Sequence, residues 1–259
     1  MQRQKKMGFS PWGLLSFPKE KHPIHGATKN PMTPTRLATI LTALVLTIPV
    51  PAQTLPEVLH QMDAASTRFH SAQADFRWDL YERVVKQTTT QNGSIYFIKN
   101  GSTTQMGAKI DPPYAKFLEY KSGTLRLFDP GADHLTVLHA GANQQQYESF
   151  LTLGFGGGGT NLAKSWTITL QGHETLNDGS ASVDTVKLNL VPKDPKVAEN
   201  VTHITIWVDL KRGISLKQQF FLPSDDQKTA TYTHIRYNQK VNTGPYAIKT
   251  DKKTTVDNR

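Results

Sequence analysis

Cysteine is absent from the 259-residue sequence, and its absence limits how the chain can be stabilised and anchored. Without disulfide bonds, the folded part must bury a sufficient hydrophobic core of its own. We also expect no N-terminal lipid anchor of the bacterial type, because that lipid is attached to a cysteine directly after a cleaved signal. Long apolar runs are missing too: residues 37–48 form the longest, which is shorter than the roughly 20 residues of a membrane-spanning helix.

Catalytic signatures are equally scarce. The histidines after residue 52 show no His-Glu-x-x-His or comparable metal-ligand spacing, and no Gly-x-Ser-x-Gly elbow is present. The glycine run 156–159 lacks the Lys-Ser/Thr pair of a phosphate loop, so we predict a mobile loop there. Asp225 and Asp226 lie in a predicted turn, where acidic residues are common. The sequence therefore favours a protein that is not an enzyme and holds no cofactor or metal.

Residues 32–52 predict a signal peptide. A short basic segment, Met32–Arg36, precedes the apolar residues 37–48, and Val50-Pro51-Ala52 places small residues before a cleavage point. We therefore expect export to the periplasm as a soluble protein after cleavage. Residues 1–31 are basic and rich in Pro, Gly and His without periodicity, which indicates an unstructured extension or a true start at Met32.

Most of the net charge of +9 belongs to this leader. Residues 1–52 carry seven Lys and Arg and one Glu, which leaves 23 of the 30 basic and 20 of the 21 acidic residues, a net charge of +3. Such a balance is typical of an ordinary protein surface, whereas nucleic-acid-binding domains are strongly basic. We therefore expect no nucleic-acid partner.

After the leader, a predicted helix is followed by a series of strands. Apolar residues recur at helical spacing from Leu55 to Phe69, with Pro56 in the first turn. A period of two then predicts strands at 72–80, 94–99, 103–109, 115–120, 124–128, 134–138, 166–170, 183–191, 203–209, 214–222 and 230–237. A second helix is predicted at 144–153, a turn at Asn92-Gly93, and a frayed charged tail at 251–259.

The clearest of these elements is a hairpin at 202–222, whose turn is Lys211-Arg212-Gly213. Its second arm places apolar residues on one side and polar residues mostly on the other: Ile214, Leu216, Phe220 and Leu222 against Ser215, Lys217 and Gln219. One buried face per strand indicates a single long antiparallel sheet, so residues 53–250 are predicted to form one α+β domain. A curved sheet covered by few helices often encloses a cavity for a small ligand.

Six short motifs follow one another behind the predicted signal peptide. The opening helix precedes Ala74-Asp75-Phe76, similar to an A-x-F entry, and Gly93–Lys99, similar to a G-x-φ-x-φ-x-R strand. Three more follow: Gly123–Pro130 (D-G-x-x-L-x-x-Y-x-P), Leu151–Gly156 (a lid helix ending in Leu and Gly) and Leu188–Lys193 (L-x-L-x-P-K). From about Leu55 to Lys249 this order resembles the outer-membrane lipoprotein carrier protein LolA and its relatives.

The resemblance implies a curved, incompletely closed antiparallel β-barrel of about ten or eleven strands, lidded by two or three short helices. It implies a monomeric periplasmic carrier whose hydrophobic cavity accepts the acyl chains of lipoproteins that cross from the inner to the outer membrane. The implied partners are acylated lipoproteins or another lipid, an inner-membrane release transporter and an outer-membrane lipoprotein receptor.

The chain departs from the family near the expected lid latch. Lys99 stands where the family has Arg, and an ammonium lacks the planar fork of a guanidinium, so a latch to lid carbonyls would be looser. Asn100 replaces a proline. Thr103 and Gln105 occupy positions where aromatics are frequent, which predicts a more polar wall. These differences leave open a lipid cargo other than lipoproteins.

The resemblance and the strand alternation together predict which residues face a cavity. The predicted wall residues are Ala74, Phe76, Trp78, Leu80, Ile95 and Phe97 on one side and Ile204, Ile206, Leu216 and Phe220 on the other. The predicted lid residues are Leu59, Met62, Phe150 and Leu153, with Lys99 as the candidate latch. From sequence alone, ordinary core packing explains each of these positions equally well.

Two other functions stay open at this stage. A sensor or protein-interaction domain of the same fold would have a filled core in place of a cavity. A small periplasmic hydrolase would have a cleft in which titratable groups with shifted pKa values cluster.

The leader yields a testable prediction about maturation. We expect the exported protein to begin at Gln53, because signal peptidase cleaves after small residues such as Ala52. N-terminal sequencing of the exported form measures this directly. An exported form that still begins at Met1 or Met32 would contradict the assignment.

Overall fold

The computed structural model describes residues 53–101, 103–141, 148, 150–151 and 153–259. The predicted extension, the signal peptide and most of the predicted helix at 144–153 lie outside these residues. Among the described helices, none has the length and apolar character that a membrane span requires. The elements are α1 (Leu55–Arg68), β1 (Ser71–Glu82), β2 (Gln87–Asn100), β3 (Thr103–Ile110), β4 (Lys116–Lys121), β5 (Thr124–Asp129), β6 (His134–His139), α3 (Gly159–Ser165), β7 (Trp166–Asn177), β8 (Ser182–Pro192), α4 (Pro195–Ala198), β9 (His203–Asp209), β10 (Ile214–Phe221), β11 (Gln227–Tyr237), η2 (Gly244–Tyr246) and β12 (Thr255–Asn258).

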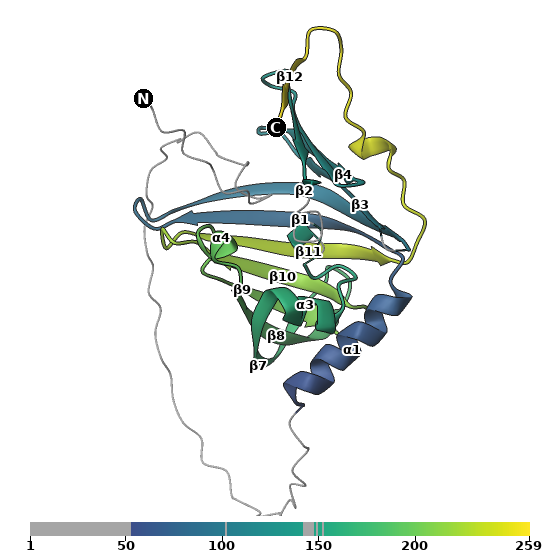
Figure 1. Ribbon diagram of the computed structural model, residues 1–259, viewed down its shortest axis with the longest axis vertical. Coiled ribbons are helices and arrows are strands. Elements are labelled where there is room, and N and C mark those ends of the chain that lie inside the picture. Colours follow the sequence, from purple (N-terminus) through teal and green to yellow (C-terminus); the bar gives the residue numbers. More distant parts are fainter. Residues whose placement is uncertain (1–52, 102, 142–147, 149, 152) are drawn as a thin grey trace, which may run out of the picture.

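The twelve described strands form one curled sheet in the order β12-β6-β5-β4-β3-β2-β1-β11-β10-β9-β8-β7. Neighbouring strands are antiparallel except β12, which pairs in parallel with β6. The end strands β12 and β7 do not pair with each other, so the sheet curls without closing (Figure 1). The predicted fold class, an incompletely closed antiparallel barrel with short helices over it, is confirmed.

Helix α1 begins where the sequence places its start. The backbone N–H of Thr54 donates to the Glu57 carboxylate at 2.8 Å, and Pro56 occupies the first turn, where its missing N–H is not needed. Val58, Met62 and Ala65 recur at spacings of four and three and are buried, so one face of the helix is covered. Figure 1 shows α1 and α3 beside the β7–β10 half of the sheet, and α1 contacts α3.

The apolar face of the sheet divides into two clusters. We call the first the core cluster; it contains buried residues of β1 to β5 and β11 together with Phe69, Leu151 and Phe155. The second, the lid cluster, joins buried residues of β7 to β10 to side chains of α1 and α3. One half of the concave face is therefore filled by the strands' own side chains and by residues of the loops, and the other half is covered by helices.

The predicted turn at Asn92-Gly93 is wrong. Strand β2 runs through it from Gln87 to Asn100, and the turn lies earlier, at residues 83–86. The Thr-rich segment 87–92 pairs with residues 77–82 of β1 as the outer part of a long hairpin, which suits β-branched threonine. Gly93 is needed for close approach, because a Cβ there would lie 2.2 Å from the Lys109 carbonyl oxygen and 2.7 Å from the Phe76 ring.

The hairpin at 202–222 is present as β9 and β10, but a β-bulge changes its facing. The register shifts between Ser215 and Lys217, so Ser215 pairs with Val208 and is buried. Beyond the bulge, Gln218 pairs with Ile206, and its amide lies on the apolar side. The polar side of β9 is buried as well, because the Lys217 ammonium lies 4.3 Å from the centroid of the Trp207 ring.

The predicted frayed tail is also wrong in part. Residues Thr255–Asn258 form β12 against β6, and the Arg259 N–H donates to the Val137 carbonyl at 2.9 Å. The segment between β11 and β12 contains η2, where Tyr246 packs edge-on against Tyr96 at 4.8 Å between ring centroids. In Figure 1 this segment runs from the end of β11 to the far end of the sheet.

The close packing of Gly93 gives a prediction for stability. Gly93→Ala should destabilise the fold by about 1–3 kcal/mol, because the added methyl group overlaps a backbone oxygen that cannot easily move. Urea denaturation of the mature protein measures the change. Gly131→Ala is the control; its Cβ meets a flexible Asp129 carboxylate at 3.3 Å, so its effect should stay within about 0.5 kcal/mol. Equal effects of both substitutions would contradict the packed position of Gly93.

Candidate functional site

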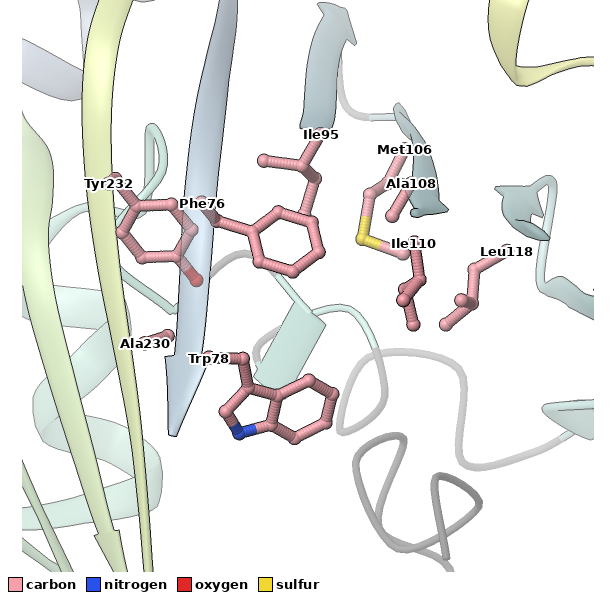
Figure 2. Close-up of a pocket in the computed structure, with 9 residues that line it drawn as sticks. All are labelled: Phe76, Trp78, Ile95, Met106, Ala108, Ile110, Leu118, Ala230 and Tyr232. Carbon is pink, nitrogen blue, oxygen red and sulfur yellow. The ribbon is translucent and has the colours of Figure 1, made fainter. Parts of the chain in front are cut away.

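A small apolar cavity lies inside the core cluster. Its volume is about 20 Å³, which is room for about one water molecule. Figure 2 shows its nine lining side chains, with the Phe76 ring beside Tyr232: Phe76, Trp78, Ile95, Met106, Ala108, Ile110, Leu118, Ala230 and Tyr232. We call this space the core cavity. An acyl chain does not fit into it without rearrangement.

A much larger space, the lid cleft, lies beside the lid. Its volume is about 820 Å³, within the range of small-molecule sites. Residues of α1, the loop 153–158, α3 and the start of β7 border it, and Lys99 and Thr104 reach it from the rim of the sheet. Its lining is mixed, with apolar side chains such as Phe150 and Trp166 and charged ones such as Lys193 and Asp194.

The ring of Phe155 stands between these two spaces. Phe155 borders the lid cleft and stacks on Phe97 of the core cluster, with ring centroids 4.3 Å apart and planes 13° apart. It also meets Tyr232, a residue of the core cavity, edge to face at 4.9 Å. Aromatic contacts of this kind add about 0.5–1.5 kcal/mol each beyond area burial. Phe155 is therefore, with Phe69, a side chain at which the open cleft meets the closed apolar interior.

The backbone around Phe155 is held by a short bridge to the sheet. Phe155 pairs with Ile214 as an isolated antiparallel bridge. The Ser215 N–H donates to the Gly154 carbonyl at 2.6 Å, and the Gly156 N–H donates to the Gly213 carbonyl at 3.2 Å. Two backbone hydrogen bonds contribute only about 1–3 kcal/mol in total, so local opening of this loop is feasible without global unfolding.

Lys99 ties the sheet to the lid. Its ammonium donates to the Ser66 carbonyl at 3.0 Å and to the Ser66 hydroxyl at 3.2 Å, and that hydroxyl donates to the Gly156 carbonyl at 2.8 Å. The side chain thus reaches a backbone carbonyl of α1 from the rim of β2. An ammonium lacks the planar fork of donors with which an arginine could also bind the loop directly. The Ser66 hydroxyl makes that contact instead.

A second tie between sheet and lid was not predicted. The Gln218 amide donates to the Leu153 carbonyl, and the Tyr232 hydroxyl donates to the Gln218 side-chain oxygen at 3.2 Å. Burial raises the pKa of Tyr232, so its phenol stays protonated and acts as the donor at physiological pH. These bonds connect Tyr232, a residue of the core cavity, to the loop 153–158, which we call the lid loop.

The predicted wall residues fall into three groups. Phe76, Trp78 and Ile95 line the core cavity, and Ala74 and Phe97 belong to the surrounding core cluster. Ile204, Ile206 and Phe220 lie instead in the lid cluster, where Leu59, Met62, Phe150 and Leu153 pack against the same half of the sheet. Leu80 is half-buried and Leu216 is buried at the bulge, and neither borders the cavity.

The expectation of a more polar wall at Thr103 and Gln105 is wrong. Phe97 pairs with Met106 and Lys99 pairs with Thr104, so Thr104 is the polar residue on the concave face. Gln105 lies on the opposite face, where its amide donates to the Tyr96 hydroxyl at 3.1 Å.

The glycine run predicted as a mobile loop is a packed connection between lid elements. A Cβ on Gly159 would lie 2.3 Å from the Leu59 carbonyl oxygen, so α3 begins in direct contact with α1. Gly156 has φ +71° and packs on the Phe69 ring. The Asp63 carboxylate accepts from the Thr160 N–H at 3.0 Å and the Thr160 hydroxyl at 2.5 Å. The glycines therefore allow α1 and α3 to pack closely.

Titratable groups with shifted pKa values are spread over the molecule. Burial alone would raise the pKa of Asp178, but hydrogen bonds from Ser180, Ala181 and Arg212 outweigh it and lower that pKa, at a hairpin end. Burial raises the pKa of Tyr120, and its hydrogen bond to Glu148 adds to this. Within the described residues, no group of three or more His, Asp or Glu side chains is placed to hold a metal ion.

Several site residues have weak sequence signals. Met106, Ala108 and Ile110 follow a period of two, as does Tyr232, so alternation alone could have found them. Phe155 lies between glycines with no periodicity around it. Gln218 is a polar residue at an inward position, which a hydrophobic pattern cannot reveal.

Comparison with known proteins gives similarity at the level of the fold. No family model and no curated protein sequence matches the chain. An uncharacterized conserved protein from Thermus thermophilus is similar over 80% of this chain and 100% of that one, with 10% identity and a TM-score of 0.50. A LolA superfamily protein from Nitrosomonas europaea is similar over 76% and 99%, with 13% identity and a TM-score of 0.38.

MucB of Pseudomonas aeruginosa, in its complex with MucA, is similar over 75% of this chain, with 13% identity and a TM-score of 0.48. The chain spans about three fifths of the MucB chain, 61% of its length. At these identities the likenesses concern the fold alone. The curled open sheet with helices over its concave side is the arrangement that the resemblance of the sequence motifs implied.

The Lys99 contacts give a prediction for lid dynamics. Lys99→Met keeps the aliphatic stem but removes the bonds to Ser66, so amide hydrogens of α1 should exchange about tenfold faster, the equivalent of roughly 1.4 kcal/mol. Hydrogen exchange followed by mass spectrometry measures this. Lys109→Met, on the outer side of β3, is the control and should leave α1 unchanged. If the α1 amide hydrogens of Lys99→Met exchange at the wild-type rate, Lys99 is not a latch.

Proposed function

We propose that the protein is a periplasmic carrier that binds the acyl chain of a lipid or lipoprotein between its lid and the concave face of its sheet. The observation that carries this proposal is the position of Phe155, whose ring borders an open cleft of about 820 Å³ and packs on residues of the apolar interior. Displacement of this ring would join the two spaces into one tunnel lined by Phe97, Phe76 and Trp78.

The energetics favour such an exchange. Each methylene transferred from water to an apolar interior contributes about 0.8 kcal/mol, so a chain of a dozen methylenes contributes on the order of 10 kcal/mol. Opening requires loss of the Phe155 ring contacts and of a few hydrogen bonds, each of about 1 kcal/mol. The gain from a bound chain exceeds this sum, and the remainder is available to separate the packed side chains around the core cavity, which holds only about one water molecule. Without a chain, these contacts keep the carrier closed.

The proposed cargo is carried from the inner to the outer membrane, with an inner-membrane release transporter and an outer-membrane receptor as partners. The predicted signal peptide and the motif order support this. The role is a non-catalytic one. Lys99 fits it as a latch that is weaker than an arginine, which favours a lid that opens readily.

A protein-interaction domain of the same fold is the second candidate. The small core cavity, about 20 Å³, favours it, because a filled core is what such a domain would have. In that case the lid would stay closed, and a partner would bind the outer surface.

Removal of the Phe155 ring distinguishes the two. In Phe155→Ala the ring no longer blocks the way from the lid cleft to the apolar interior, so N-phenyl-1-naphthylamine and dansyl-undecanoic acid should associate at least tenfold faster than with wild type. Stopped-flow fluorescence of the mature protein measures the association rate, and equilibrium titration measures the affinity.

Phe117→Ala and wild type serve as matched controls, because the Phe117 ring packs on Phe128 and borders neither space. If Phe155→Ala takes up the probes no faster than Phe117→Ala, the site does not lie behind Phe155. If folded wild type binds neither probe, the carrier function is wrong, and the protein-interaction domain becomes the better account.

A further inference from the structure

A buried amide on the concave face has no hydrogen-bond partner. Across the described residues, three buried side-chain polar atoms lack one, and two of them are the oxygen and nitrogen of Gln91. The third is the indole nitrogen of Trp166, which borders the lid cleft. Gln91 is 5% exposed, so bulk solvent does not satisfy its amide. The Trp166 nitrogen therefore lies at the lid cleft, and the position of Gln91 follows from the strand register.

The register places Gln91 beside the core cavity. Gln91 of β2 pairs with Trp78 of β1, and Trp78 pairs with Ala230 of β11. Directly paired residues of antiparallel strands share a face, and Trp78 and Ala230 both line the cavity. Gly93, two residues further along the same face, has no side chain to separate Gln91 from the Phe76 ring. The Gln91 amide is thus part of the same surface.

An unpartnered buried amide destabilises the folded protein. Its lost hydration is not replaced, and an apolar side chain of similar size would remove the penalty. Nearly all buried polar groups in proteins have partners, so the exceptions call for an explanation. Polar groups that weaken the empty protein are typical of binding sites, where a ligand supplies the missing partner.

A cation lies at the same end of the concave face. Lys228 of β11 pairs with Leu80, two residues beyond Trp78, and its ammonium lies 6.0 Å from the Trp78 ring centroid. Burial lowers the pKa of Lys228, while Asp226 acts in the opposite direction. A nearby positive charge favours a ligand group that carries negative charge or an electron-rich oxygen.

We propose that Gln91 binds the carbonyl oxygen of an acyl ligand at the inner end of the cavity, with the amide N–H as donor. The ligand class is a single-chain lipid that enters head first, a free fatty acid or a simple ester, with its tail directed along Phe76 and Ile95 toward Phe155. This rests on the proposed function and narrows its cargo. A lipoprotein would keep its ester groups outside and would leave Gln91 unpartnered.

The experiment uses three ligands that share one chain and differ at its end. Dodecanoic acid, methyl dodecanoate and dodecane displace N-phenyl-1-naphthylamine from the mature protein, its Gln91→Met variant and a Gln105→Met control. Gln105 lies on the outer face and bonds to Tyr96, so its loss should leave all three displacements unchanged. Thermal unfolding of each unliganded protein is measured alongside.

Gln91→Met should weaken displacement by the acid, or by both the acid and the ester, about tenfold, and leave dodecane unchanged. It should also raise the Tm of the unliganded protein by a few degrees, because the orphaned amide is removed. A loss with the acid alone identifies a carboxylate ligand, and a loss with both identifies a carbonyl.

Three results would overturn the assignment of Gln91. Equal loss for all three ligands would mean that Gln91 acts through packing, and no loss for any would mean that it does not contact the ligand. A lower Tm or failure to fold would mean that the amide has a structural partner. The carrier function survives each of these as long as wild type binds the probe; failure of wild type to bind removes both proposals.

Discussion

The need to cover an apolar concave face is the constraint on which the rest of the structure depends. A sheet of twelve strands that curls but does not close exposes one long face to be buried, and the chain has no disulfide to assist. Helices α1 and α3 cover the β7–β10 half, while the other half is filled by its own large side chains and by Phe155. We call the boundary between the helix-covered half and the half filled by its own side chains the seam, and the lid loop, residues 153–158, lies there.

This arrangement makes the seam the natural place for a ligand. On the β7–β10 half, helix side chains interdigitate with strand side chains, so opening would expose the whole lid cluster at once. Among the described residues, the Phe155 ring, two backbone hydrogen bonds and the side-chain bonds of Lys99, Ser66 and Gln218 hold the loop at the seam. Local opening there exposes much less apolar surface than global unfolding does. Polar ties to backbone carbonyls can also reform without exact side-chain repacking.

Much of the architecture follows from the sequence because period-two alternation and turn residues are local signals. The opening helix and the β4–β5 and β9–β10 hairpins were predicted from them, whereas the incompletely closed barrel was implied by the family resemblance. The long-range pairing of β12 with β6 was not predicted. β12 comes from the end of the chain and pairs with β6 in parallel, and its hydrogen-bond partners lie at a sheet edge that exists only in the folded protein. The bulge at Ser215 was missed because a bulged strand has the sequence pattern of a regular strand. The strand through Gly93 was missed because Asn-Gly is the usual sequence of a tight turn, whereas here the glycine is needed for close packing.

The site was predicted only in part, for a related reason. Phe76, Trp78 and Ile95 were found because inward apolar residues alternate along a strand, but alternation does not tell which residues lie under a lid and which surround a cavity. Phe155, Gln218 and Gln91 depend on loop position and register, which only the three-dimensional arrangement reveals. The central claim, that the seam admits an acyl chain, is tested most directly by native mass spectrometry of the mature protein purified without detergent from an exporting host. The account predicts added mass that organic solvent releases as an acyl lipid. Folded protein with no lipid mass, isolated instead with a bound polypeptide, would contradict it.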